Sequence, residues 1–446
     1  MSLTSSALPD AAAVVKQAGV VGAGGAGFPT YVKMGSRVRL VIANGAECDL
    51  LMKKDQEVMT RHAEGIVRGL ELVMQSTGAD RAVIALKRKY APAWAALEAA
   101  LGRHPQIELF ALDDFYPAGD EFILVNEVTG CVVPEGGLPL DCGVVVQNVE
   151  TLWNVARAMD GSPVTHKYVS VMGEVSSPGT YLVPLGMPVG ALVGLAGAAS
   201  DVVLIDGGAM MGKVVSRQDP VTKTTGGILV LPPDNPAALG KTLSLRSILY
   251  RARSVCIQCR ACTDMCPRYL LGHSIEPHRV MRTVAYGARD TAPLGALLCS
   301  LCGLCQFFAC PMGLSPARVN EAVRIELSRA GTKLPHKRRT PTPRPLARYR
   351  RVPSGRLAQR LGVARYDVPV PYRGEVALEP ESVLTLPLGQ GVGRPAVPVV
   401  RAGEEVSAGQ VIAEAAPAGP SVPLHAPADA VVRQVTSVAV TLEVRG

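Results

Sequence analysis

Apolar and amphipathic segments alternate along the first 150 residues of the chain. Three short apolar runs, at 38–43, 82–86 and 107–111, are typical of buried strands. We interpret the two longer segments between them, 56–75 and 91–101, as helices. An order of strand, helix, strand, helix and strand predicts a parallel sheet covered by helices.

A glycine-rich turn precedes the first of these strands. A short helix is expected over 10–19, with Asp10 as its cap, and the turn at 22–27 then holds four glycines in six positions. Such a turn lets the backbone approach a ligand and can cradle a phosphate with its N–H groups. Glycine-rich turns also occur without a ligand, so the turn alone leaves both interpretations open.

The later parts of the chain change character several times. Residues 165–215 favour strand, turn, strand and short helix, helices are expected at 278–286 and 315–330, and short strands between turns follow residue 380. We therefore expect four domains, at 1–160, 161–245, 246–331 and 376–446, and a linker at 332–375 between the third and the fourth.

Composition and charge limit the classes of protein. The 446 residues are 48% hydrophobic, which permits real cores, and the net charge is +8. The sequence has no run of about 18 apolar residues and no basic N-terminal region followed by an apolar core. We expect no membrane span, no secretory signal and a cytoplasmic location.

Part of the positive charge lies in a segment rich in Lys, Arg and Pro, at 333–351. A nucleic-acid patch is one interpretation of it. The prolines prevent a basic helix, and no aromatic stacking platform lies beside the segment. We favour a basic extended linker that docks on an acidic surface, and we expect no nucleic-acid partner.

Eight of the eleven cysteines form two regular runs. The first is C-x₂-C-x₂-C-x₃-C-P, and the second differs by one extra residue before its last cysteine. The first spacing is that of a bacterial ferredoxin run, in which three cysteines hold one cluster and the fourth ligates the other. The pattern predicts two [4Fe–4S] clusters. The first would be held by Cys256, Cys259, Cys262 and Cys310, and the second by Cys266, Cys299, Cys302 and Cys305.

Three other interpretations of these runs are less favoured. A long chain without a secretory signal does not need a disulfide framework. Zinc sites usually pair two CxxC units, with no triple run and Cys-Pro ending. Inert buried cysteines would not be so regularly spaced. The remaining Cys48, Cys131 and Cys142 have no partner that the sequence assigns, and buried structural thiols are the default for them.

Four short motifs of the first segment carry a family resemblance. They are Gly24-Gly25-Ala-Gly27-Phe28-Pro29-Thr30, Asn44-Gly-Ala-Glu47, Tyr116-x-x-Gly119-Asp120-Glu121 and Gln147-Asn148-Val-Glu150-Thr151. Together they resemble the flavin-binding 51-kDa subunit of respiratory complex I and, more closely, the C subunit of the Rnf electron transport complex. The resemblance implies a Rossmann-like domain that binds FMN and receives hydride from NADH. The cofactor-binding residues that it implies are Gly22, Gly24, Gly25, Gly27, Lys33, Asn44, Glu47, Tyr116, Gly119, Glu121, Asn148 and Thr151.

Three positions depart from the complex I pattern. Val21 and Ala23 stand where that family has arginines, and Asp120 stands where it has Glu. The resemblance then implies that the FMN phosphate is bound by backbone N–H groups and by Lys33.

Two further modules resemble parts of the same families. Residues 165–215 resemble the SLBB β-grasp module, for which a structural role is favoured over contact with a corrinoid or a partner. Residues 380–446 resemble a biotinyl/lipoyl-type barrel-sandwich hybrid, but no lysine follows Lys337, so a swinging arm is excluded. The expected fold class is a multidomain α/β chain with an FMN/NADH-binding domain, an SLBB domain, a two-cluster ferredoxin-like helical domain and a C-terminal β barrel-sandwich hybrid.

The order of the modules resembles that of the PduS-type corrinoid reductases of propanediol-utilising microcompartments. This resemblance implies an NADH-dependent cobalamin reductase, which takes cob(III)alamin towards cob(I)alamin for a cobalamin-dependent diol dehydratase. It also implies a cob(I)alamin adenosyltransferase and shell proteins as partners inside a microcompartment. Residues 2–12 are small and apolar and are a candidate encapsulation tag, and the helix that the family has before the glycine-rich loop explains them equally well. Two alternatives stay open. One is an Rnf-type subunit that serves a membrane complex or ferredoxin, and the other is a non-catalytic electron-relay or docking protein.

Overall fold

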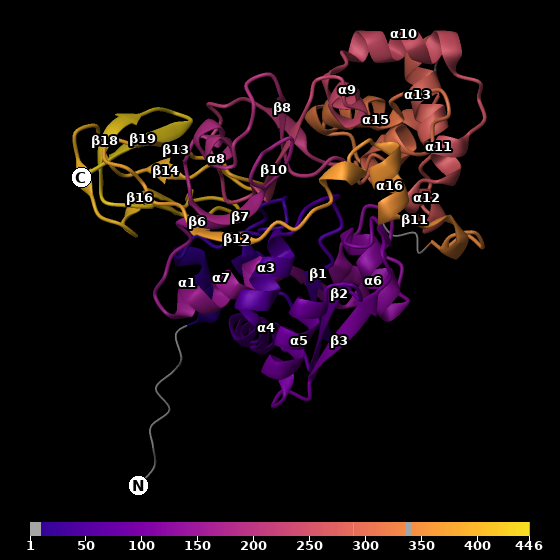
Figure 1. Cartoon of the computed structure of the whole chain (residues 1–446). Coiled ribbons are helices and arrows are strands. Elements are labelled where there is room, and N and C mark those ends of the chain that lie inside the picture. The colour runs from indigo at the N-terminus through magenta and orange to yellow at the C-terminus, as the bar shows by residue number, and fades with distance from the viewer. Residues whose placement is uncertain (1–9, 289, 335–340, 446) are drawn as a thin grey trace.

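The computed structural model describes residues 10–288, 290–334 and 341–445. In Figure 1 the first domain, indigo to purple, lies at the bottom of the view. The cysteine-rich domain and the C-terminal β domain lie above it on opposite sides. Residues 2–9 of the candidate encapsulation tag and the basic residues 337–339 lie outside the described residues.

A four-stranded sheet in the order β3-β2-β1-β5 forms the centre of the first domain. All of its strand pairs are parallel, which confirms the sheet predicted from the alternation of strands and helices. Its strands are β1 (Leu40–Gly45), β2 (Arg81–Lys87), β3 (Ile107–Leu112) and β5 (Val144–Asn148). The domain also contains α1 (Ala11–Gln17), α2 (Thr30–Met34), α3 (Lys54–Arg61), α4 (Ala63–Thr77), α5 (Ala91–Leu101), β4 (Phe115–Tyr116), α6 (Glu121–Thr129), η1 (Pro139–Cys142) and α7 (Val149–Met159).

The helix expected over 56–75 is interrupted. The chain leaves the helical conformation at His62, between α3 and α4. The His62 ring stacks on Trp153 with ring centroids 4.3 Å apart, and its Nε2 lies 2.8 Å from the Tyr168 hydroxyl oxygen. These contacts come from distant segments, so the local apolar spacing does not encode the break.

The second domain contains a six-stranded sheet in the order β12-β7-β6-β10-β8-β9. Its elements are β6 (His166–Gly173), β7 (Gly179–Pro184), α8 (Val189–Leu195), β8 (Val203–Asp206), β9 (Lys213–Val215), β10 (Gly227–Leu231) and β12 (Tyr372–Glu375). The strand β12 pairs in parallel with β7, although it comes from the distant segment 332–375.

The cysteine-rich domain is built from short helices packed around the two cysteine runs. The expected helices at 278–286 and 315–330 correspond to α13 and α15. The elements of this domain are α9 (Pro236–Thr242), α10 (Leu245–Val255), α11 (Ala261–Asp264), α12 (Pro267–Leu270), α13 (Pro277–Tyr286), η2 (Ala292–Leu298), α14 (Leu304–Phe307) and α15 (Pro316–Arg329).

Across the described part of the chain, none of the helices combines the length and apolarity that a membrane crossing needs.

The segment expected as an extended linker contains secondary structure of its own. It holds η3 (Arg348–Arg350), β11 (Val352–Pro353), α16 (Ser354–Arg360), η4 (Ala364–Tyr366) and β12. The strand β11 pairs with β4, where Val352 stands opposite Tyr116. Arg351 forms ion pairs with Glu127 at 2.5 Å and Asp113 at 3.6 Å. The segment therefore crosses the first domain and packs on it.

The C-terminal domain consists of two small sheets, in the orders β13-β19-β18-β15 and β14-β16-β17. Their strands are β13 (Val383–Pro387), β14 (Val397–Pro398), β15 (Glu405–Val406), β16 (Val411–Glu414), β17 (Leu424–His425), β18 (Ala430–Val435) and β19 (Ala439–Val444). Buried residues of this domain, such as Leu384, belong to one apolar core with Val20 of the first domain and Val183 of the second.

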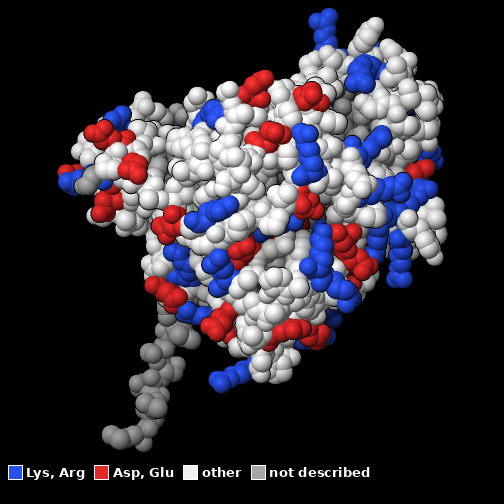
Figure 2. All heavy atoms as spheres, viewed as in Figure 1, with Lys and Arg blue, Asp and Glu red and all other residues white. Residues whose placement is uncertain are grey.

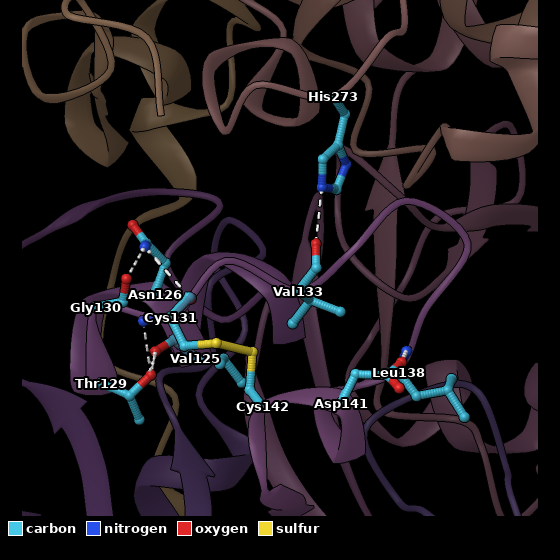
Figure 3. Close-up of a disulfide and its surroundings, with 10 residues drawn as sticks. All are labelled: Val125, Asn126, Thr129, Gly130, Cys131, Val133, Leu138, Asp141, Cys142 and His273. Atoms are coloured by element: carbon cyan, nitrogen blue, oxygen red, sulfur yellow. Dashed lines mark hydrogen bonds between the residues drawn. A yellow bond between two sulfur atoms is a disulfide. The ribbon is translucent and has the colours of Figure 1, made fainter. Parts of the chain in front are cut away.

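Cys131 and Cys142 form a disulfide, as Figure 3 shows, so the expectation of two buried thiols is wrong. The chain turns back after α6, and the short helix η1 returns it to the same place, which brings the two sulfurs together. Within the loop that the disulfide closes, the Val133 carbonyl oxygen lies 3.0 Å from His273 Nε2 of the cysteine-rich domain. Cys48 remains a free, partly buried cysteine.

Candidate functional site

Several of the residues that the sequence assigns to FMN gather at the carboxyl edge of the parallel sheet. Asn44 near the end of β1 and Asn148 at the end of β5 are partners in the strand register. Asn44 Nδ2 donates to the Gly119 carbonyl oxygen at 2.9 Å. A Cβ at Gly119 would lie 3.1 Å from the Cβ of Ala46, so the loop before α6 packs closely on the edge. Ligands of open α/β sheets bind at such edges.

The glycine-rich turn stands beside this edge with its middle exposed. Ala23 N donates to Thr151 Oγ1 at 2.9 Å, which anchors the turn to α7. Gly24, Gly25 and Ala26 are exposed, and within the described chain their N–H groups have no hydrogen-bond partner. Gly25 has φ +121°, which glycine adopts far more readily than other residues. Three adjacent donors are therefore free to bind an anion.

Lys33 and Glu121 form an ion pair at the same edge. Lys33 Nζ donates to Glu121 Oε1 at 3.1 Å and to the Val146 carbonyl oxygen at 2.8 Å. The two side chains are 25% and 45% exposed, and an ion pair this exposed is weak. The ammonium can therefore exchange this partner for an anionic ligand at little cost.

Glu47 titrates near neutral pH. Its backbone is in the left-handed region, with φ +36°, and its carboxylate accepts from Asp55 N at 2.8 Å and from Gln56 Nε2 at 3.2 Å. Burial, and after it the charge of Asp55, raises the pKa of Glu47 to about 7. Shifted carboxyl groups of this kind are concentrated at functional sites.

A chain of buried charged side chains supports this edge, and sequence reasoning missed it. Lys54 Nζ lies 3.0 Å from Glu150 Oε2 and 2.5 Å from Asp55 Oδ1. Lys167 of β6 donates to the same Glu150 oxygen, and Asn148 Nδ2 donates to Asp55 Oδ2 at 2.9 Å. Buried charges persist only when they are paired. The bonded partners lie up to 96 positions apart, so no local motif could indicate them.

A cavity of about 230 Å³ opens at the ends of β1 and β2, next to Glu47. Lys87 and Lys89 line it, and both pair with Asp114, at 3.0 and 2.6 Å. Ser354 and Ala358 of α16 also line it, so the segment 332–375 forms part of the wall of the cavity.

Tyr116 is placed differently from the other assigned residues. Its side chain is 1% exposed, and its hydroxyl donates to the backbone carbonyl oxygen of Cys302 at 2.7 Å. Close by in the sequence, Asp120 Oδ2 accepts from Arg268 Nη2 at 3.0 Å. Tyr116 and Asp120 therefore join the first domain to the cysteine-rich domain.

The electrostatic interactions among the eight clustered cysteines fall mostly within two groups, although Cys262 and Cys305 also interact across them. The outer group is Cys256, Cys259, Cys262 and Cys310, and the inner group is Cys266, Cys299, Cys302 and Cys305. Burial and the charges of the other three outer cysteines raise the pKa of Cys262 to about 12. Burial and the charges of Cys302 and Cys299 raise the pKa of Cys266. This division has the same members as the ligand sets expected from the sequence, and the ligand assignment itself stays a prediction.

The two groups differ in exposure. Of the free cysteines, all of which lie within the described residues, only Cys259 in the outer group is exposed. In the described part of the chain, no three Cys, His, Asp or Glu side chains are already arranged as a site for a metal ion. A [4Fe–4S] cluster differs from a single ion because each cysteine binds a different iron, so the sulfurs stand farther apart.

Family models match four parts of the chain. They are described as the Nuo51 FMN-binding domain at 15–157, the SLBB domain at 168–214, the 4Fe-4S dicluster domain at 255–315 and the RnfC barrel sandwich hybrid domain at 375–444. These matches confirm the expected fold class.

Known proteins match nearly the whole chain. Cobalamin reductase PduS of Salmonella typhimurium is 43% identical over 439 residues, which cover 97% of this chain and 96% of that protein. The chain belongs to the PduS family of cobalamin reductases. The PduS protein of Citrobacter freundii is 41% identical over the same shares of the two chains. In Acetobacterium woodii, the C subunit of the Na⁺-translocating ferredoxin:NAD⁺ oxidoreductase complex is 36% identical over 58% of this chain and 57% of its own.

The residues present fit FMN, the ligand named in the family model that matches 15–157. Three free N–H groups and an exchangeable lysine lie at one edge of the sheet, as a phosphate requires. Val21 and Ala23 are 6% and 2% exposed, so these two positions face the protein interior rather than solvent. The structure thus fits a phosphate that is held mainly by backbone.

The cysteines of this PduS family member also fit iron–sulfur clusters. Eight thiols in two adjacent groups of four match the ligand number of two cubes. Leu314 N donates to Cys310 Sγ at 3.3 Å, and Leu301 N donates to Cys299 Sγ at 3.4 Å. Hydrogen bonds to cysteine sulfur tune cluster potentials. The raised thiol pKa values mean that iron binding must release protons.

Proposed function

We propose that the protein takes electrons from NADH and delivers them to a corrinoid, with FMN and two [4Fe–4S] clusters as its cofactors. One NADH supplies the two electrons that take one cob(III)alamin to cob(I)alamin, and it leaves as NAD⁺ with release of a proton. Bound FMN supplies the exchange between two-electron and one-electron chemistry. The full-length similarity to cobalamin reductases supports a corrinoid acceptor more strongly than the Rnf-type subunit, which matches 58% of the chain.

The contact between Tyr116 and Cys302 is the observation that carries this proposal. Tyr116 lies three residues before the FMN-edge residue Gly119, and Cys302 belongs to the inner cysteine group. The two residues share one apolar cluster with Leu50 of the first domain and Met210 of the second. A buried, packed contact between the two cofactor regions suits electron transfer.

The difference in exposure gives the electron route a direction. The inner group adjoins the FMN edge through Cys302, while the outer group reaches the surface at Cys259, beside Ile257, which is 60% exposed. In our proposal electrons enter at the inner group and leave at the outer group. Figure 2 shows Lys and Arg side chains gathered on the right of the view, at the cysteine-rich domain, and such a surface favours an acidic partner protein.

Specific roles follow for the assigned FMN residues. The exposed turn would hold the phosphate, Lys33 would neutralise it, and the two asparagines would fix the edge against which the flavin lies. Glu47 would set the charge of this edge near pH 7. We further propose a cob(I)alamin adenosyltransferase and shell proteins as partners, and a location inside a microcompartment.

Cofactor stoichiometry and reduction by NADH test the proposal. The full chain is reconstituted anaerobically with FMN, iron and sulfide, and we expect about one FMN and about eight irons per chain. Addition of NADH should bleach both the flavin and the cluster absorbance. A protein that binds the clusters but no flavin would overturn the proposal and favour a relay role.

A further inference from the structure

The C-terminal barrel contacts the glycine-rich turn directly. The loop 388–394, which follows β13, donates a hydrogen bond from Val392 N to the Ala26 carbonyl oxygen at 2.9 Å. A Cβ on Gly391 would lie 2.6 Å from the Cα of Gly27. The two loops therefore meet backbone against backbone, at a distance that glycine alone permits at both positions.

A buried lysine fixes this contact to the second domain. Lys223 is 2% exposed, and its Nζ donates to the Gly19 carbonyl oxygen at 2.7 Å and to the Pro423 carbonyl oxygen at 3.0 Å. Its backbone N donates to Gln390 Oε1 at 2.9 Å. One residue thus ties together the chain before the turn, the barrel and the barrel loop.

The turn has one covered side and one open side. Gly27 is buried under the barrel loop, and a small cavity of about 30 Å³ lies between the turn and the barrel. A Cβ on Gly25 would meet no atom within 4 Å. The barrel therefore stands behind the turn and leaves its donors accessible.

We propose that the C-terminal barrel positions the FMN phosphate cradle: its loop 388–394 holds the turn from behind, so that the N–H groups of Gly24, Gly25 and Ala26 stay directed at the ligand. This inference rests on the proposed binding of FMN. Preorganised donors bind more tightly because less ordering is needed on binding. Such support gains importance here because Val21 and Ala23 provide no charge to the phosphate. It also gives a role to a lipoyl-like module that has no lysine to acylate.

Two glycine substitutions in the barrel test the proposal. Gly391→Ala places a methyl group against Gly27, whereas Gly403→Ala strains a glycine at φ +85° where a Cβ meets no atom within 4 Å. Both full-length variants, with their clusters reconstituted and without flavin, are titrated with FMN and with riboflavin, which lacks the phosphate. Iron content and thermal unfolding are measured alongside.

For Gly391→Ala we expect the Kd for FMN to rise about tenfold, as a backbone strain of about 1.4 kcal/mol would cause. The Kd for riboflavin should stay nearly unchanged, and the ³¹P resonance of bound FMN should shift. Gly403→Ala should bind both flavins as the parent does. Gln390→Ala removes the acceptor for Lys223 N and the donor to the Pro387 carbonyl oxygen but adds no methyl group against the turn, so it should weaken FMN binding less.

Other outcomes separate the two proposals. If Gly391→Ala and Gln390→Ala bind FMN as the parent does, or if both flavins weaken equally, the positioning role is overturned while FMN binding stands. If the parent chain itself binds no FMN, the proposed function fails and the positioning role fails with it.

Discussion

Lys167 donates a hydrogen bond to Glu150 across the boundary between the SLBB and FMN-binding domains. The two side chains are 1% and 0% exposed. Lys54 binds the same carboxylate oxygen, and Tyr168 N donates to the other oxygen at 3.1 Å. The flavin edge therefore depends on a charge from a neighbouring domain.

Replacement of Lys167 by an uncharged residue should lower both the stability of the protein and its affinity for FMN. Lys167→Met leaves Glu150 buried with one cationic partner fewer, and we expect a loss of about 3 kcal/mol in the free energy of unfolding. FMN should also bind more weakly, because Lys54, Asp55 and Asn148 share the network. Lys213→Met, at an exposed position of the same domain, is the matched control and should change the stability by less than about 0.5 kcal/mol. Equal effects of the two substitutions, measured by chemical denaturation, would contradict the prediction.

The pH dependence of FMN binding should report on Glu47. Its pKa is raised from 4.5 to about 7, so the folded protein binds a proton between these values more readily than the unfolded chain does. The contribution of Glu47 to stability is therefore largest below pH 4.5 and is lost as the pH rises to about 7. Above that pH the new negative charge at the edge should weaken binding of the anionic FMN.

Titrations of the parent and Glu47→Gln with FMN between about pH 5.5 and 8.5 measure this effect. The ratio of the two Kd values should change through about pH 7, and the ionisation of the FMN phosphate cancels in that ratio. A constant ratio would rule out titration of Glu47 in this range.

Tyr116→Phe tests the contact between the flavin edge and the inner cysteine group. The substitution leaves the Cys302 carbonyl oxygen without its donor, and we expect a loss of about 1 kcal/mol in stability. Electron transfer from NADH to the clusters should slow several-fold with FMN and iron contents unchanged, as stopped-flow absorbance would show. Tyr250→Phe, at a side chain that is 71% exposed, should change neither quantity. An unchanged rate in Tyr116→Phe would show that this contact does not lie on the electron route.

Substitution of one cysteine in each group should show at which group electrons enter and at which group they leave. Cys302→Ser and Cys259→Ser should each remove one cluster and about half of the iron. In Cys259→Ser, NADH should still reduce the remaining inner cluster, whereas in Cys302→Ser the outer cluster should be reduced far more slowly. Electron paramagnetic resonance after anaerobic addition of NADH measures both. The reverse pattern would invert the proposed direction.

The sequence predicted the elements that rest on local spacing. The parallel sheet and the helices α13 and α15 follow from apolar periodicity. The cysteine ligand sets rest on a fixed motif and stay a prediction. The break at His62 could not be predicted in this way, because it depends on Trp153 and Tyr168. Likewise, the Cys131–Cys142 disulfide depends on how η1 returns the chain.

The residues of the candidate site are brought together by tertiary contacts, which spacing in the sequence does not encode. Motif residues such as Asn44 and Asn148 are adjacent because β1 and β5 pair, although 104 positions separate them. The support of that edge by Lys167 and the cover over Gly27 by Gly391 come from other domains. Neither partner belongs to a motif, so spacing in the sequence carries no signal for either contact.

Corrinoid reduction by NADH tests the central claim most directly. The reconstituted full chain is mixed anaerobically with NADH and aquacobalamin, and the corrinoid spectrum is followed beside a control with free FMN. The account predicts reduction much faster than with free FMN, and loss of that reduction in Cys259→Ser while the flavin is still bleached by NADH. If the flavin and clusters are reduced but the corrinoid changes no faster than in the control, the acceptor is another molecule and the account is contradicted.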